Sequence, residues 1–171
     1  MIDMNYDLIG LNMQESITLD KFDIAILHAL DQDARIPWVE LAQRVSLSAS
    51  ACQRRSQALQ AAGIIERYAI HVDSTALGFD VEAFVAVNIE RQNMDFAKQF
   101  RDTMLALPEI QSCYMLSGAI DFMLRVVARD LREYGQFIQR EILNLPGVKD
   151  ASSSIVLEQI KRGRGVPLVA T

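Results

Sequence analysis

The chain has 171 residues, of which half are apolar and 23% are charged, and its formal net charge is -5. This length fits one compact domain or two small ones, and the composition is ordinary for a soluble globular protein. No run of about 18 apolar residues occurs, which excludes a membrane-spanning helix. Two histidines and two widely separated cysteines make a metal site unexpected.

Residues 1–17 are interpreted as a loose leader, with Met13 as an alternative start. The leader carries acidic residues and no basic n-region, so it does not resemble a signal peptide. We therefore expect a cytoplasmic protein in which Cys52 and Cys113 are reduced thiols.

Two helical patterns follow the leader. Over residues 18–34, apolar residues recur at i, i+3 and i+4 spacing, which predicts an amphipathic helix with Thr18 or Asp20 as its N-cap. Pro37 suits the first position of a second, short helix over residues 37–45. Four side chains of this second helix are expected to face inward: Val39, Leu41, Ala42 and Val45.

A third helical pattern begins after a tight break, with Ser48 as a natural N-cap and Gly63 as its end. Three short helices with a three- to four-residue turn before the last are typical of a helix-turn-helix. Spacing along the third helix puts one set of side chains on a packing face: Cys52, Ser56 and Leu59. A second set is expected to point away: Ala49, Ser50, Gln53, Arg54 and Gln57.

The third helix has the composition of a DNA-reading helix. Residues 48–63 hold two arginines and no acid, although the whole chain is acidic. Arg bonds the guanine edge and Gln the adenine edge in the major groove, while Ser48 and the first amides of the helix suit a phosphate. DNA responds to the field at the contact face more than to net charge, because salt screens over about 8–10 Å. The alternative is an ordinary solvated helix face.

The second half of the chain has a different pattern. Residues 64–73 alternate like a strand and lead to a turn at Gly78. The order βαββαβ is then predicted, with a helix at residues 130–145 opened by Asp130 and Glu133 at capping-box spacing. The other predicted elements are a strand at 81–90, a helix at 94–107, strands at 109–118 and 120–129, and a last strand at 148–161.

An internal repeat supports this order. LALPEI at residues 105–110 matches LNLPGV at residues 143–148, and each lies where a helix passes into a strand. A repeated βαβ half is typical of a split βαβ, ferredoxin-like sheet. A domain boundary is placed near residues 74–80.

These motifs together resemble the Lrp/AsnC (feast/famine) family of transcriptional regulators. In the first half the similarity lies in LDxxDxxIL at 19–27, ELA at 40–42, LSxS at 47–50, RR at 54–55 and GII at 63–65. In the second half it lies in SGxxDFML at 117–124, LPGV at 145–148 and SIVLEQIK at 154–161. Two unrelated sets of motifs in the right order make the resemblance specific over about residues 18–162.

The resemblance implies an α+β protein with an N-terminal winged helix-turn-helix domain and a C-terminal ferredoxin-like βαββαβ domain. It divides the chain into a leader at 1–17, a DNA-binding domain at 18–75, an effector-binding and oligomerisation domain at 76–162 and a tail at 163–171. Dimers would form through the sheet, and in this family they commonly assemble into octamers. Double-stranded DNA would bind seven residues: Ser48, Ala49, Ser50, Gln53, Arg54, Arg55 and Gln57. Of Arg54 and Arg55, at least one would contact DNA and one would hold the domain together.

The resemblance also implies an amino-acid effector bound between dimers, with no other cofactor. The positions carried over are Ser117, Gly118, Ala119, Ile120, Asp121 and Ser153. Asp121 suits an α-ammonium group, but a turn cap or an interface ion pair is the alternative. Ser153 is alternatively a strand residue facing solvent or a neighbour. Ala119 lacks the polarity usual at its position, which leaves the effector unidentified.

Ser56 replaces an apolar residue that is usual in the recognition helix, which is expected to loosen packing by about 1 kcal/mol. An enzyme is not expected, because no nucleophile–base pair, phosphate loop or metal motif occurs. The competing function is a ligand-sensing module that assembles through protein contacts rather than DNA. Steep salt dependence would distinguish DNA binding from such contacts.

Overall fold

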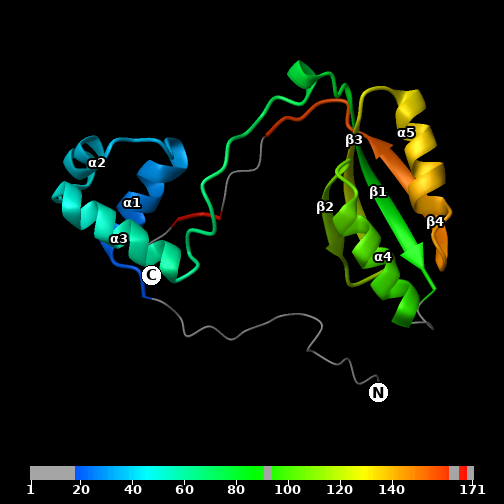
Figure 1. The fold of residues 1–171 in the computed structure, drawn as a ribbon, viewed down its shortest axis with the longest axis horizontal. Helices are drawn as coiled ribbons and strands as arrows, with labels where there is room; N and C mark the ends of the chain where they lie inside the picture. Colours follow the sequence, from blue (N-terminus) through cyan, green and yellow to red (C-terminus); the bar gives the residue numbers. More distant parts are fainter. Residues whose placement is uncertain (1–17, 91–93, 162–165, 169–171) are drawn as a thin grey trace. The chain divides into compact units, whose positions relative to one another are not determined.

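The computed structural model describes residues 18–90, 94–161 and 166–168 of the chain. Figure 1 shows a helical unit and a sheet unit, and the chain passes from the first to the second between residues 70 and 71. Residues 166–168 belong with the helical unit, although they follow the sheet unit in sequence. Among the described helices, none is long and apolar enough to cross a membrane.

Helix α1, Lys21–Gln32, begins where the sequence predicted. Of the two candidate caps, Asp20 is the N-cap: its carboxylate accepts from the amides of Phe22 and Asp23, and the Asp23 carboxylate accepts from the Asp20 amide in return. This reciprocal capping box satisfies amides that the first turn leaves without partners. The helix buries four residues in the core of the first unit: Ile26, Leu27, Ala29 and Leu30.

Helix α2, Trp38–Val45, follows Pro37, which is its N-cap rather than its first residue. Leu41, Ala42 and Val45 are buried as expected. The inward position predicted for Val39 is wrong, because that side chain is 66% exposed. At 3.6 residues per turn, Val39 lies about 200° around the helix axis from Leu41, on the opposite side.

Helix α3, Ala49–Ala61, is capped by Ser48, whose hydroxyl accepts from the Ala51 amide at 3.2 Å. Gly63 lies just beyond its end with φ 72°, a conformation that glycine adopts without strain. Cys52, Ser56 and Leu59 are buried, so the predicted packing face is confirmed. They face the apolar side chains of α1 and α2 across one small core.

The strand predicted at residues 64–73 is wrong, since the structure has no strand there. The alternating apolar side chains of this segment are exposed, Ile70 by 83%, and no neighbouring strand pairs with it in a single chain. Period-2 alternation does not make a ladder without a partner strand. A short 3-10 helix, η2 at Thr75–Leu77, then ends at Gly78 with φ 81°, the predicted turn.

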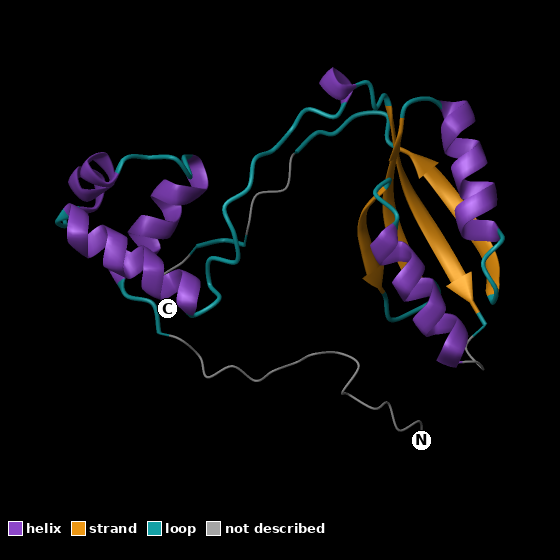
Figure 2. Cartoon of the chain, in the orientation of Figure 1, coloured by secondary structure: helices purple, strands orange, loops and turns teal. Residues whose placement is uncertain are grey.

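The second unit is an antiparallel sheet in the order β2-β3-β1-β4, shown by the arrows in Figure 2. Its strands are β1 at Val81–Ile89, β2 at Ile110–Met115, β3 at Phe122–Ala128 and β4 at Val148–Ile155. Strand β1 is central and pairs with both β3 and β4. The split βαβ order predicted from the repeat gives this arrangement.

Two helices cover one face of the sheet. Helix α4, Met94–Ala106, and helix α5, Leu131–Phe137, contribute to one apolar core with the inward side chains of β1 and β3. Helix α5 continues as a π-helix, η3 at Ile138–Leu143, which the sequence did not predict. The predicted cap Asp130 accepts from the Glu133 amide at 2.7 Å.

The last predicted strand begins at Val148 as expected but ends earlier than expected. Strand β4 ends at Ile155, so residues 156–161 are not part of it. Leu157 and Ile160 are exposed, whereas Val156 is half-buried and its amide continues toward β1 by donating to the Glu82 carbonyl. In the tail, Leu168 packs against the core of the first unit. The predicted leader at residues 1–17 lies outside the described residues.

Candidate nucleic-acid interface and candidate effector site

The turn between α2 and α3 gives this pair of helices its helix-turn-helix geometry. Ser46 adopts a left-handed conformation, with φ 55°, and closes α2 through its amide, which donates to Ala42. Leu47 is partly buried against the core, and Ser48 opens the next helix. Three residues, 46–48, therefore connect the end of α2 to the start of α3.

One side of α3 is exposed to solvent and carries only uncharged polar side chains and one cation. Its exposed members among the predicted DNA-binding residues are Ser48, Ser50, Gln53, Arg54 and Gln57. Ala49 is not among them, because it is partly buried against the core. The expectation that Ala49 points away is wrong, since Ala49 precedes Cys52 by three residues and Ser56 by seven and so shares their buried face.

Arg54 and Arg55 are in different environments. The Arg55 guanidinium contacts the carboxylates of Asp20 at 2.9 Å and Asp23 at 2.7 Å, and it lies 5.6 Å from the centre of the Phe22 ring. These hydrogen bonds, that to Asp23 above all, raise the pKa of Arg55. Arg54 is exposed and has no ion-pair partner among the described residues.

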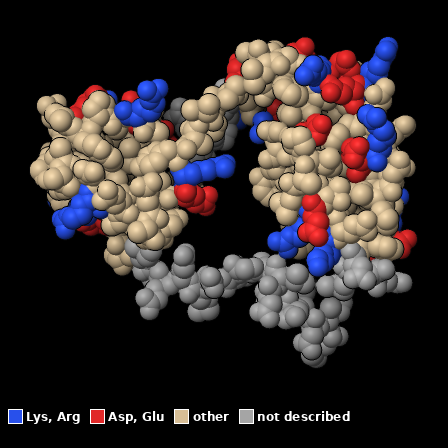
Figure 3. Space-filling model, viewed as in Figure 1, with Lys and Arg blue, Asp and Glu red and all other residues tan. Residues whose placement is uncertain are grey.

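The same ion pairs neutralise the acidic residues nearest to α3. The acids of the α1 N-terminus that approach α3 are the two that Arg55 neutralises, while α3 itself contains no acid. On the face drawn in Figure 3, basic and acidic side chains alternate without a broad patch of either sign. The local positive charge of α3 therefore comes from Arg54 and from the amides at its N-terminus.

The loop between β2 and β3 contains the predicted effector residues 117–121. Its ends are held together by the Leu116 amide, which donates to the Asp121 carbonyl at 2.9 Å. Gly118 has φ 137°, which other residues rarely adopt. Ser117, Gly118 and Ala119 are exposed, whereas Ile120 and Asp121 are half-buried.

Asp121 joins this loop to the end of β1. Its carboxylate accepts from the Ile89 amide at 3.0 Å, and its own amide donates to the Asn88 side chain at 3.2 Å. Asn88 in turn donates to the Asp150 carboxylate at 3.0 Å, next to an irregularity in the β1–β4 register. Within one chain, Asp121 therefore anchors the loop to β1, and its contact with an ammonium group stays a prediction.

Ser153 is not brought to this loop within one chain. Its hydroxyl accepts from the Tyr134 hydroxyl at 2.6 Å, and burial raises the pKa of that tyrosine. Ser153 pairs with Val85, four residues from the strand end that Asp121 contacts, or about 13 Å along the strand.

Sequence reasoning missed the positioning role of four residues. Asp20 and Asp23 appeared only as a helix start, although acids at i and i+3 before a basic helix also suit an ion pair with it. Asn88 and Asp150 gave no signal, because their pairing depends on the β1–β4 register. Among the residues that the structure describes, no group of three or more His, Cys, Asp and Glu side chains is placed to hold a metal ion.

Comparison with known proteins identifies both units. The AsnC-type helix-turn-helix domain matches residues 19–60, and the Lrp/AsnC ligand binding domain matches residues 82–166. Transcriptional regulator AzlB of Bacillus subtilis strain 168 is 36% identical over 89% of this chain and 97% of its own length. The leucine-responsive regulatory protein of Escherichia coli strain K12 is 34% identical over 84% of this chain and 88% of its own length.

Solved structures give the same result. A transcriptional regulator from Neisseria meningitidis, crystallised as its complex with L-Met, superposes with a TM-score of 0.85 at 38% identity, covering 88% of this chain and 97% of that one. An AsnC family transcriptional regulator from Agrobacterium tumefaciens superposes with a TM-score of 0.82 at 32% identity, covering 88% of this chain and 97% of that one.

Proposed function

The chain belongs to the Lrp/AsnC family, whose members are transcriptional regulators and not enzymes. From this premise we propose that it regulates transcription by reading double-stranded DNA with α3, under the control of a small amino acid bound at the loop between β2 and β3. The observation that carries the proposal is the exposed, acid-free side of α3 beside a neutralised α1 N-terminus.

Arg54 is the residue that we assign to base reading. An unpaired guanidinium on an exposed helix side suits bidentate bonding to guanine, and Gln53 and Gln57 flank it on the same side. Ser48 and Ser50, at the helix N-terminus, suit phosphate contacts. Arg55 acts through its ion pairs with α1, which fix the orientation of α3, and we assign it a positioning role.

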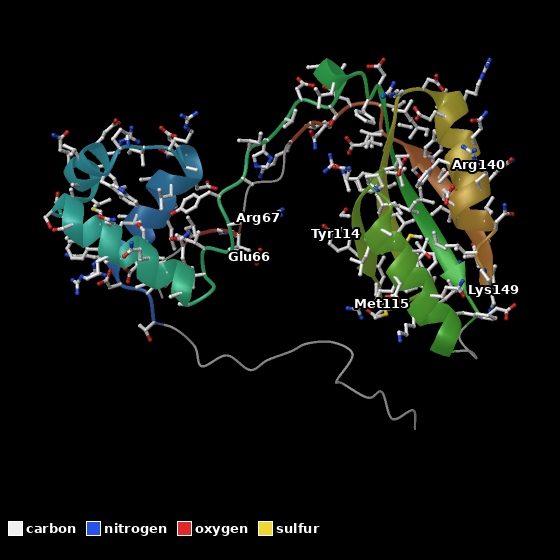
Figure 4. All side chains as sticks on the ribbon, viewed as in Figure 1. Glu66, Arg67, Tyr114, Met115, Arg140 and Lys149 are labelled. Carbon is white, nitrogen blue, oxygen red and sulfur yellow. The ribbon has the colours of Figure 1, made fainter. Side chains whose placement is uncertain are left out.

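A homodimer would place two such helices for adjacent half-sites. The sheet face opposite the two helices carries Phe84, 43% exposed, and Tyr114, 59% exposed, and Figure 4 labels Tyr114 with Met115 on β2. A bidentate ion pair from Arg125 to Glu82, at 2.7 and 3.2 Å, lies on this face. Exposed aromatic side chains beside a paired charge suit contact with a second copy. Further assembly of dimers into octamers is part of the proposal.

The effector that we propose is a free amino acid. The Neisseria relative is named for its L-Met complex and the Escherichia relative for its response to leucine. Ser117 and Ala119 are exposed, and their amides and the Ser117 hydroxyl suit an α-carboxylate, while Asp121 holds the loop against β1. Ser153 is about 13 Å along the sheet from the loop's anchor, so its part in the site requires a neighbouring subunit. We place this regulator in the cytoplasm.

Selection of genomic DNA fragments on the purified protein, followed by footprinting, tests the DNA half of the proposal. We expect protected segments spaced at about 34 Å or its multiples, since two-fold-related helices read half-sites one turn apart. Binding should weaken steeply as salt rises. Retention of DNA without sequence preference, or association with other proteins that salt does not weaken, would instead favour a module acting through protein contacts.

A thermal-shift panel of the twenty amino acids tests the effector half. One amino acid should raise the unfolding temperature of the sheet unit, because a ligand that binds only the folded state stabilises it. Asp121→Asn should reduce this shift through loosening of the loop. A panel in which no amino acid shifts the unfolding temperature would remove the effector and leave the DNA reader.

A further inference from the structure

The C-terminal segment of the chain returns to the helical unit. The carbonyl oxygen of Leu168 lies 2.9 Å from Nε2 of His28 on α1. The Leu168 side chain is half-buried and packs against the core of the first unit. Its neighbour Val166 is 80% exposed. Of residues 166–168, which the structure describes, Leu168 makes the contact, and it joins positions 140 residues apart in sequence.

His28 and Leu168 complement each other chemically. A carbonyl oxygen only accepts, so Nε2 must carry the proton and donate. The apolar surface that Leu168 contacts is the core of the first unit, to which α1 contributes Leu27 and Ala29 on either side of His28. One directional bond beside one apolar contact defines a small docking site for a leucine-containing peptide in extended conformation.

Helix α1 also provides the ion-pair partners of Arg55, which lies on α3. Asp20 and Asp23, at its N-terminus, ion-pair with that arginine of α3. A contact that stabilises α1 therefore also stabilises the residues that hold α3, the helix proposed to read DNA. The segment that makes the contact is continuous with β4, which ends at Ile155 in the sheet unit.

We propose that this site on α1 binds the chain's own C-terminal segment and makes it a second connection from the sheet unit to the DNA-reading unit. The first connection is the polypeptide that leaves α3. The effect of this second connection on DNA binding rests on the proposed function, whereas the docking of the C-terminal segment does not. Because the segment belongs to the same chain, its docking is intramolecular and loses less entropy than the binding of a free peptide would.

Hydrogen–deuterium exchange of the full-length protein tests the docking. Leu168→Ala should speed exchange of the peptide covering residues 21–32 about fivefold, since a half-buried leucine loses roughly half of its burial free energy. Val166→Ala, in the same segment but exposed, is the matched control and should leave that exchange unchanged. Peptides from β1 and β3 should be unaffected in both variants, which shows that the sheet unit remains folded.

Two histidine variants separate the hydrogen bond from general destabilisation of α1. His28→Ala should speed the same exchange as Leu168→Ala does, and the double variant should add little to either single one. His28→Gln keeps an N–H donor and should restore part of the protection. If Leu168→Ala exchanges like Val166→Ala, or the two single effects add fully, the docking site is wrong.

A DNA titration distinguishes this inference from the proposed function. If the wild type binds a selected operator, Leu168→Ala should weaken that binding and Val166→Ala should not. If neither protein binds DNA while exchange of α1 still depends on Leu168, the proposed function fails and the docking stands. If both bind equally and exchange is also equal, the docking fails and the proposed function stands.

Discussion

The two units of this chain build their cores in different ways. The sheet unit buries an all-apolar cluster from two strands and two helices, and backbone ladders join its four strands. The helical unit has a smaller core that includes Ser56, 1% exposed, whose hydroxyl has no hydrogen-bond partner among the described residues. Its long-range polar support comes from the ion pairs between Arg55 on α3 and the acids at the α1 N-terminus, and from the hydrogen bond between His28 and Leu168.

This difference suggests a division of labour. A unit held by many ladder bonds and apolar contacts opens rarely, whereas one held by few long-range contacts opens at a lower free-energy cost. A small contact can therefore change how often the helical unit opens, whereas the same contact would have little effect on the sheet unit. An effector bound to the sheet unit then needs to supply only a modest coupling free energy to change DNA binding.

The largest expected effect falls on the sheet unit. In Gly147→Ala the new methyl group would lie 2.5 Å from the Phe96 ring at a residue with φ 80°, which combines overpacking with backbone strain. We expect a loss of about 3 kcal/mol in unfolding free energy. Gly78→Ala is the matched control, with φ 81° and no atom within 4 Å, and should lose only about 1 kcal/mol. Urea titration measures both, and equal losses would show that Phe96 yields.

Variants of Arg54 and Arg55 distinguish a residue that contacts DNA bases from one that positions α3. Arg54→Ala should weaken binding of a selected operator by about 1–3 kcal/mol and leave the melting temperature unchanged. Arg55→Ala should lower the stability of the helical unit by about 1 kcal/mol, because its ion pairs are partly exposed. Anisotropy titration and calorimetry on the same samples make the comparison. If the Arg54→Ala protein bound the operator with wild-type affinity, the assignment of Arg54 to base reading would be wrong.

Ser56 should reveal the weakness of the helical core directly. Ser56→Ala removes a buried hydroxyl without a partner and should raise the stability of this unit by about 1 kcal/mol. Ser50→Ala, exposed on the same helix, should change it by less than about 0.5 kcal/mol. Denaturant melts followed by helical circular dichroism give both values. A destabilised Ser56→Ala protein would mean that the hydroxyl is satisfied in solution.

Acid should affect the helical unit through its capping box. The hydrogen bond from the Asp23 amide lowers the pKa of Asp20, helped by the Phe22 amide and by Arg55. A lowered pKa gives stability that is complete above the unfolded value of about 3.9 and is lost as pH falls through the folded value. Melts between pH 6 and about 3 should therefore show a shallower acid loss in Asp20→Asn than in wild type. Parallel curves would exclude this linkage.

Much of the fold followed from local signals in the sequence. The cap at Ser48, the ends at Gly63 and Gly78, and the helix opened by Asp130 were predicted because caps and turns are decided within a few residues. The repeated helix-to-strand junctions indicated the βαββαβ order. These features depend on contacts close in sequence, where residue type alone is informative.

The errors lie where tertiary context decides. Tyr68, Ile70 and Val72 alternate like a strand but are exposed, since no strand lies beside them in one chain. Ser153 was grouped with the loop by resemblance, whereas register places it against Tyr134. The role of Arg55 could not be separated from that of Arg54 by sequence, because the partner carboxylates lie 32 residues or more away.

The most direct test of a DNA reader controlled by an amino acid is one titration. Fluorescence anisotropy with DNA from the protein's own upstream region, at several salt concentrations and with each of the twenty amino acids, measures reading and control together. We predict saturable, sequence-preferring binding that weakens steeply with salt and shifts with one amino acid. The absence of binding at low salt, or binding that salt does not weaken, would contradict the account.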